Sequence, residues 1–179
     1  MKIKNFTCLS LRFVLLLVLL LLIEVPFIAK SQEKIDEIEF VVNSNKITFF
    51  QNKTIINVVT SNRNNLPVLT ILNNNRTYMP AQLFEYMSIL KAVIDYDVST
   101  KKVTATLVST IDQNKSLILT TGTNQAIVDG EVVILDTSIP ETTLTSGIPY
   151  FPIRFIFETF DCKVGWDSKR QAVNVNLPE

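Results

Sequence analysis

The chain carries Asn75-Arg76-Thr77-Tyr78-Met79-Pro80 and uses the same plan again at Gly147-Ile148-Pro149-Tyr150-Phe151-Pro152. Both hexapeptides end in tyrosine, a large apolar residue and proline, and Pro152 follows Pro80 by 72 positions. An apolar run follows each of them. A matched pair of this kind constrains the fold more than a single motif, because it indicates one supersecondary unit used twice.

A second matched motif follows each apolar run. It is Asp95-Tyr96-Asp97 in the first case and Gly165-Trp166-Asp167 in the second, 70 positions later. An alternating apolar and polar strand then closes each pattern. The sequence therefore predicts two internal repeats, at about residues 66–107 and 136–177, which we call the first stretch and the second stretch.

Strand patterns dominate the rest of the sequence. At residues 103–107 and 173–177, apolar residues alternate with threonine or asparagine, the period of a strand with one buried face. Asp129-Gly130 is a preferred dipeptide for a two-residue hairpin turn. Polar turns separate three further apolar runs, at Ile38–Val42, Ile47–Phe50 and Ile55–Val59. Such short connections predict antiparallel pairing.

Two segments have helical periodicity. Their apolar faces are Leu83, Met87 and Leu90 in the first stretch and Phe155, Ile156, Thr159 and Phe160 in the second. Each segment follows a proline, Pro80 or Pro152, a residue that suits the first helical position. The pattern predicts an α+β fold: mainly antiparallel β-sheet with two short helices, built from a duplicated turn–helix–β-hairpin unit. Ser61–Asn75 and Asp136–Gly147 are predicted to be matching long connections.

The N-terminus has the layout of a secretory signal peptide over residues 1–31. A basic region precedes an uncharged apolar run, Phe13–Ile23, and Ala29-Lys30-Ser31 supplies small residues for cleavage. An uncleaved membrane anchor is the alternative, but it needs about 20 apolar residues, and a charged residue and a proline interrupt this run early. We expect residues 32–179 to form one domain of a secreted, extracellular or cell-wall-associated protein.

Charge and cysteine content narrow the classes of partner. Removing residues 1–31 deletes four of the 17 basic residues and one of the 17 acidic residues, which leaves 13 against 16. Since no basic block remains, we expect no nucleic-acid partner and no membrane contact after cleavage. Cys162 is then the single cysteine, and we interpret it as a small buried residue.

The second stretch also has a family signature. Pro152-Ile153-Arg154-Phe155-Ile156-Phe157-Glu158 is followed by Lys163-Val164-Gly165-Trp166-Asp167. This order resembles the repeated signature of the copper amine oxidase N-terminal-like (stalk) domain family. The first stretch matches it through residues 75–80 and Val93-Ile94-Asp95-Tyr96-Asp97, and the resemblance covers roughly residues 66–177. It implies an antiparallel sheet against helices, in a module of secreted or wall-associated proteins of Gram-positive bacteria.

Each stretch departs from the family pattern at one arginine. Gln82 occupies the helix arginine position in the first stretch, whereas the second keeps Arg154. Conversely, Ile148-Pro149 stands in the second stretch where the first has Arg76-Thr77. These departures argue against two equivalent binding sites.

The sequence contains no histidine, and imidazole is the favoured ligand of copper and of catalytic zinc. We therefore expect no copper site. Because no Gly-x-Ser-x-Gly or phosphate-binding glycine motif occurs, we also expect no catalytic residue and no cofactor. Asp95, Asp97 and Asp167 could contribute to a calcium site. The preferred interpretation is that Asp97 and Asp167 bond backbone amides in Asx-type turns. The remaining candidates for turn or structural roles are Pro80, Asp129, Gly130 and Pro152.

Six residues are candidates for ligand binding: Arg76, Tyr78, Tyr150, Arg154, Glu158 and Trp166. Arg154 and Glu158 are four positions apart, so they form either a polar site or an ordinary i,i+4 helix pair. The aromatic residues either stack on sugars or cover the helix–sheet core. The core role is the preferred interpretation, and it is also expected of Tyr96, the counterpart of Trp166.

Together these observations predict a secreted, non-catalytic binding or structural module of the bacterial cell envelope. Its partner would be an envelope protein, or peptidoglycan or another wall polysaccharide, recognised through the sheet surface or an edge strand. One alternative is a small hydrolase of wall polymers that uses carboxylates such as Glu158. Another is an accessory or inhibitory subunit of a secreted enzyme.

Overall fold

The computed structural model describes residues 34–61, 69–139 and 148–178. By their contacts, Glu33–Glu179 form one compact unit. The predicted signal peptide and residues 140–147 of the second predicted connection lie outside the described residues. No helix within the described ranges has the length and apolar character of a membrane-spanning segment.

The largest part of this unit consists of two five-stranded antiparallel sheets. Sheet A has the strand order β12-β13-β1-β2-β3, and sheet C has the order β10-β9-β8-β7-β6. The strands of sheet A are β1 (Glu37–Val41), β2 (Lys46–Gln51), β3 (Thr54–Thr60), β12 (Lys163–Asp167) and β13 (Ala172–Asn176). The strands of sheet C are β6 (Leu90–Asp97), β7 (Lys102–Ser109), β8 (Ser116–Thr120), β9 (Gln125–Val128) and β10 (Glu131–Ile134).

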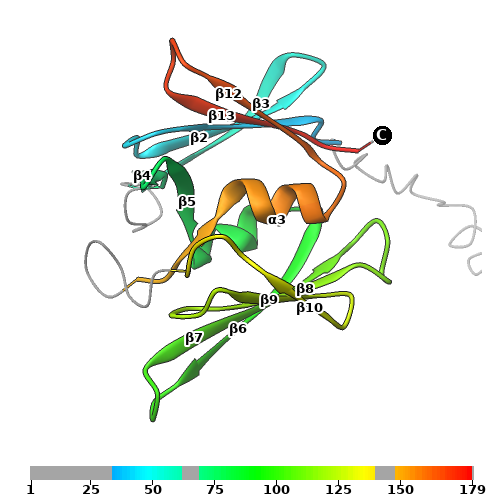
Figure 1. The fold of residues 1–179 in the computed structure, drawn as a ribbon. Coiled ribbons are helices and arrows are strands. Elements are labelled where there is room, and N and C mark those ends of the chain that lie inside the picture. The colour runs from blue at the N-terminus through cyan, green and yellow to red at the C-terminus, as the bar shows by residue number, and fades with distance from the viewer. Residues whose placement is uncertain (1–33, 62–68, 140–147, 179) are drawn as a thin grey trace, which may run out of the picture. The chain divides into compact units, whose positions relative to one another are not determined.

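Among the described residues, a small antiparallel sheet and two helices complete the unit. Sheet B has the order β11-β5-β4, with β4 (Ile71–Asn73), β5 (Arg76–Pro80) and β11 (Tyr150–Pro152). The helices are η1 (Ala81–Tyr86), a 3-10 helix, and α3 (Ile153–Thr159). Figure 1 shows α3 between sheet A and sheet C. The expected fold class, mainly antiparallel sheet with two short helices, is thus confirmed.

One hydrophobic core joins the sheets and helices. Phe40 of β1 packs on Phe157 of α3 with ring centroids 5.7 Å apart, and Phe84 of η1 packs on Phe151 of β11 at 5.9 Å. The inward residues of sheet C belong to the same cluster, including the fully buried Leu107. Neither helix is long enough to be stable alone, so this packing holds both in place.

Asparagine and aspartate allow tight hairpins in all three sheets. Asp129 and Gly130 both have positive φ, 50° and 87°, and connect β9 to β10 as the sequence predicts. The turns Asn52-Lys53 and Asn74-Asn75 also have positive φ at both residues. Two successive positive φ values are those of a type I′ turn, whose twist matches that of the paired strands.

The two stretches follow the same order of strand, helical turn and β-hairpin. In the first hairpin Asp97 Oδ1 accepts hydrogen bonds from the amides of Ser99 and Thr100, at 2.8 and 3.3 Å. In the second, Asp167 Oδ1 accepts the equivalent two bonds at 2.9 and 3.1 Å. The fourth residue after each aspartate has positive φ, 57° and 51°. Both aspartates therefore make the backbone bonds of an Asx-type turn.

Three details of the sequence interpretation are wrong. Leu90 is not helical: the chain leaves the helix at Met87, whose ψ is 95°, and Leu90 pairs with Ser109 in sheet C. Pro80 and Pro152 are the N-cap residues of their helices, whereas the sequence predicts them at the first helical position. Both prolines are also the last residues of strands that pair within sheet B, so the helices begin one residue later. The expected connection before Arg76 contains β4, which pairs with β5.

Candidate functional site

An open groove brings together four of the six predicted binding residues. Arg76 comes from β5, Arg154 and Glu158 come from α3, and Trp166 comes from β12. The groove has a cavity volume of about 820 Å³, within the range of small-molecule sites. Its other lining residues are Leu72, Asn74, Asn75, Thr77, Asp136, Pro152, Phe155 and Val173. We call this surface the arginine groove.

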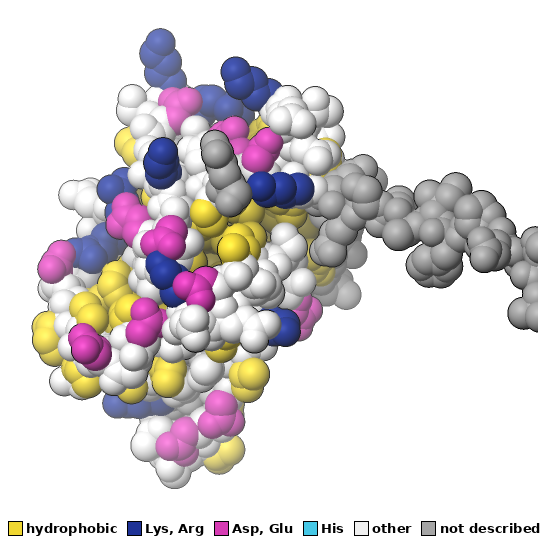
Figure 2. Space-filling model, turned by 90° about the vertical axis from the view of Figure 1, so that its right-hand side faces the viewer, with side chains coloured by type: hydrophobic (Ala, Val, Ile, Leu, Met, Phe, Trp, Pro, Cys, Tyr) yellow, Lys and Arg dark blue, Asp and Glu magenta, His cyan; other side chains and the backbone are white. Residues whose placement is uncertain are grey.

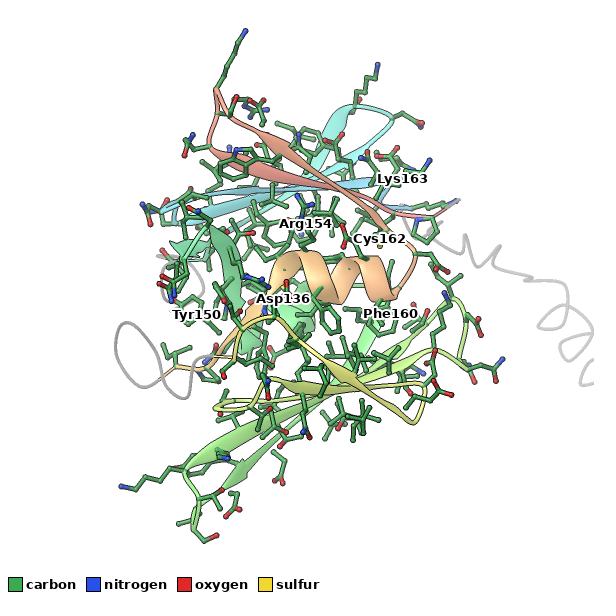
Figure 3. The ribbon with its side chains drawn as sticks, in the orientation of Figure 1. Asp136, Tyr150, Arg154, Phe160, Cys162 and Lys163 are labelled. Carbon is green, nitrogen blue, oxygen red and sulfur yellow. The ribbon has the colours of Figure 1, made fainter. Side chains whose placement is uncertain are left out.

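Arg76 is held at one wall of the arginine groove by an ion pair. Its Nη2 donates to Asp136 Oδ2 at 2.9 Å, and Asp136 is 86% exposed. Asp136 follows β10, whereas Arg76 follows the asparagine turn between β4 and β5, so the pair joins segments 60 residues apart. Figure 3 labels Asp136 on the segment beside α3. This pairing fixes the guanidinium and leaves its remaining donors available.

Arg154 is less constrained. Its Nη1 lies 3.9 Å from Glu158 Oε1, and the two side chains are 60% and 50% exposed. This is the i,i+4 helix pair expected from the sequence, at the outer limit of an ion pair and worth little in stability. Because the pair is long and solvated, the guanidinium can turn toward a ligand at small cost.

Trp166 supplies an apolar surface in the arginine groove. It is 41% exposed and lies opposite Val173 in the β12–β13 hairpin, and both residues line the groove. Phe155 of α3 continues the apolar floor. The expectation that Trp166 and Tyr96 cover the core is wrong, since Tyr96 is 55% exposed. Both lie one residue before the end of a strand that leads into a hairpin turn.

Tyr78 and Tyr150 are buried, at 4% and 1% exposed. They take the core role that the sequence favours, and neither offers a ring face to solvent. Tyr78 lines a smaller cavity of about 170 Å³ beside the arginine groove. Arg76 and Asp136 line both the small cavity and the groove. Of the two tyrosines, Tyr78 therefore lies next to the groove without lining it.

The first stretch forms a second groove with different chemistry. Gln82, Tyr96 and Val103 line it at the positions that match Arg154, Trp166 and Val173. Its other lining residues are Ala81, Phe84, Glu85, Ala92, Ile94, Lys101 and Pro149. No hydrogen-bond partner for the buried Gln82 Oε1 is found among the described residues. The two grooves occupy matching places but are not equivalent, and we call this one the β6 groove.

The described residues contain one free thiol, Cys162, and no metal-binding cluster. Within the described ranges, no group of three or more His, Cys, Asp or Glu side chains could hold a metal ion. Cys162 is buried, as expected, and burial raises the pKa of its thiol to about 11, with a further contribution from Asp161. A thiol with this pKa is protonated and unreactive at neutral pH.

Charges of both signs are mixed on one face of the molecule. The face in Figure 2 has acidic and basic side chains intermixed, with apolar side chains between them. Four polar members of the arginine groove are not among the residues predicted from the sequence: Asn74, Asn75, Thr77 and Asp136. The sequence pattern places the asparagines in a connection, and no sequence signal links Asp136 to Arg76 across 60 residues.

Comparison with known proteins identifies one family. A family model described as the copper amine oxidase N-terminal domain matches residues 58–175, which is most of the chain. The comparison with curated proteins gave no match. The comparison with solved structures gave none either.

Proposed function

Because the chain belongs to the copper amine oxidase N-terminal domain family, we propose that it acts as an exported, non-catalytic binding module of the bacterial cell envelope. The domain that gives the family its name is itself non-catalytic. The basic and apolar N-terminal segment supports export as a cleaved signal peptide. The matched hairpins of the two stretches support an origin by duplication of one unit.

A single observation carries the proposal: Arg76, Arg154 and Trp166 meet in one open groove although they come from three different elements. An indole with an exposed surface can cover the apolar face of a sugar ring. Guanidinium groups bind carboxylates through two parallel hydrogen bonds. The asparagine amides beside Arg76 add donors and acceptors. This set fits a wall glycan that carries carboxylate groups, as peptidoglycan does.

The hydrolase alternative has weaker support. A glycosidase needs one carboxyl group in an apolar environment that keeps it protonated. In the arginine groove Asp136 is 86% exposed and paired with Arg76, and Glu158 is half exposed beside Arg154. Each carboxylate is exposed and has an arginine beside it, so neither lies in such an apolar environment. The accessory-subunit alternative also relies on surface recognition, and a protein partner for the same groove would support it.

The single tryptophan allows a direct test. Because Trp166 is the only tryptophan of the chain, its fluorescence reports on the arginine groove alone. We expect soluble peptidoglycan fragments to change this fluorescence in a saturable way. Arg154→Ala should weaken binding about tenfold, the value of one charged hydrogen bond. The matched control is Lys169→Ala, at an exposed cation outside the groove, which should bind like the wild type. A flat titration would refute the glycan assignment.

A further inference from the structure

The longest free sheet edge of the described residues is β6. It has eight residues in unbroken register with β7. The other edge strands are irregular or shorter. The pairing of β3 with β2 shifts register between Phe49 and Phe50 of β2. Strand β12 has five residues, β10 has four, and β4 and β11 have three each. Proteins usually keep edges short, bulged or covered, because an open edge pairs with another strand. Among the described strands, β6 has neither the short length nor the bulge.

The backbone of β6 presents its unpaired groups at alternate residues. Thr110 N donates to Ile89 O at 2.9 Å, which places residue 89 in a hydrogen-bonded pair with the neighbouring strand. Antiparallel ladders alternate, so residues 91, 93 and 95 also bond toward β7. The N–H and C=O groups of Ala92, Ile94 and Tyr96 therefore point to the free edge.

The side chains of β6 separate by chemistry between the two faces of sheet C. Ala92, Ile94 and Tyr96 line the β6 groove, which has a cavity volume of about 720 Å³. On the opposite face Val93 is 68% exposed, with Lys91 on one side of it and Asp95 on the other. The edge thus has apolar side chains toward the groove and a cation, valine and anion on the outer face.

This arrangement is self-complementary. If β6 pairs antiparallel with β6 of a second molecule about a twofold axis at Val93, Lys91 of each molecule lies opposite Asp95 of the other. Ala92 of each molecule then lies opposite Ile94 of the other in a hydrogen-bonded pair. The free N–H and C=O groups of these residues therefore bond to each other across the interface, as an antiparallel ladder requires. Opposite charges placed directly across a ladder stabilise it.

We propose that β6 is a homodimer interface, at which two copies of this chain join their C sheets into one continuous ten-stranded sheet. A twofold interface requires that one surface be complementary to itself, and the Lys91–Val93–Asp95 row meets this condition. An unrelated peptide would need only the open edge, whereas the placement of opposite charges about a central valine specifically favours a second β6. The proposal goes beyond the arginine groove and does not depend on it.

Charge exchange tests the register. Sedimentation equilibrium of the purified protein should show a monomer–dimer equilibrium. Lys91→Asp and Asp95→Lys should each weaken the dimer about tenfold, because each replaces two attractive cross-strand pairs by two repulsive ones. An equimolar mixture of the two variants should restore association, since every 91–95 pair is then of opposite charge. A monomer at all concentrations, or a dimer unaffected by both variants, would overturn the proposal.

A cysteine at the axis gives an independent readout. In the proposed register Val93 faces its own copy in a non-hydrogen-bonded pair, with Cα atoms about 4.5 Å apart, within the range of a disulfide. Val93→Cys should therefore form a covalent dimer under mild oxidation. The matched control, Val132→Cys on the opposite edge strand β10, is also exposed and should remain monomeric on a reducing-agent-free gel. Equal cross-linking of the two variants would contradict the β6 interface.

Discussion

Met79 and Phe151 occupy matching positions of the two stretches and lie directly opposite each other where β5 pairs with β11. The neighbouring pairs exchange matched residues, since Tyr78 faces Pro152 and Pro80 faces Tyr150. This is the relation that a local twofold axis through the Met79–Phe151 pair would produce. Both side chains are fully buried. The two stretches therefore meet through equivalent strands at the centre of the core.

The first prediction concerns this central pair. Phe151→Ala should lower the free energy of unfolding by about 3–5 kcal/mol and Met79→Ala by about 2–5 kcal/mol, because each leaves a cavity in a packed core. Denaturant unfolding followed by Trp166 fluorescence would measure both. The control is Val98→Ala, at a residue that is 77% exposed, and it should change the free energy of unfolding by less than about 0.5 kcal/mol. Comparable losses at all three positions would contradict the assigned core.

The second prediction compares an ion pair that has one buried partner with an ion pair whose partners are both exposed. Glu39 is almost fully buried, and its Oε1 accepts from Arg170 Nη2 at 2.8 Å. Arg170→Ala leaves this carboxylate without its cation and should cost about 1–3 kcal/mol. Arg154→Ala removes an exposed partner of Glu158 and should cost at most about 0.5 kcal/mol. If the two variants unfold alike, Arg170 does not compensate the Glu39 charge.

The third prediction concerns the pKa of Asp97 and the stability of the fold at low pH. Hydrogen bonds from Ser99, and then from Thr100, lower the pKa of Asp97 from 3.8 to about 2. Because the folded pKa is below the unfolded one, this contribution to stability is present above pH 3.8 and is lost as the pH falls through about 2. NMR titration should find Asp97 ionised at pH 3. Ser99→Ala should move its pKa back toward 3.8. An unchanged pKa in this variant would contradict the turn geometry.

The fourth prediction concerns the buried thiol. With its pKa raised to about 11 by burial, Cys162 should react slowly with a thiol reagent at neutral pH and quickly once the protein unfolds. Without the predicted signal peptide, residues 1–31, Cys162 is the single thiol of the protein. Its labelling rate should rise steeply across the denaturant transition. Full labelling of the native protein within the reagent's mixing time would show that the thiol is accessible.

Local patterns predicted the local structure well. Asp129-Gly130 predicted its hairpin because both residues tolerate positive φ, and the alternation in residues 103–107 predicted the inward face of β7. Leu90 was assigned to the wrong element because residues 83, 87 and 90 satisfy helical spacing and are all buried. Pairing with β7 decides the conformation of Leu90, and spacing along the chain does not report such pairing.

The candidate site was predicted only in part. Arg154 and Glu158 were recognisable as a helix pair, and the matched aromatic positions singled out Trp166. Their convergence with Arg76 depends on the pairing of β5 with β11 and on the place of β12 at the edge of sheet A. Burial separated the tyrosines from Trp166, although all three are aromatic residues at repeated positions. Pairing between strands distant in sequence decides both which residues meet in the groove and which aromatic side chains are buried.

Binding to the cell wall tests the central claim most directly. Purified peptidoglycan sacculi should carry the wild-type protein into the pellet on centrifugation. A double variant, Arg154→Ala with Trp166→Ala, should stay in the supernatant, while Lys169→Ala should pellet like the wild type. Equal partitioning of all three proteins would contradict a binding role for the arginine groove, whether all of them bind or none does.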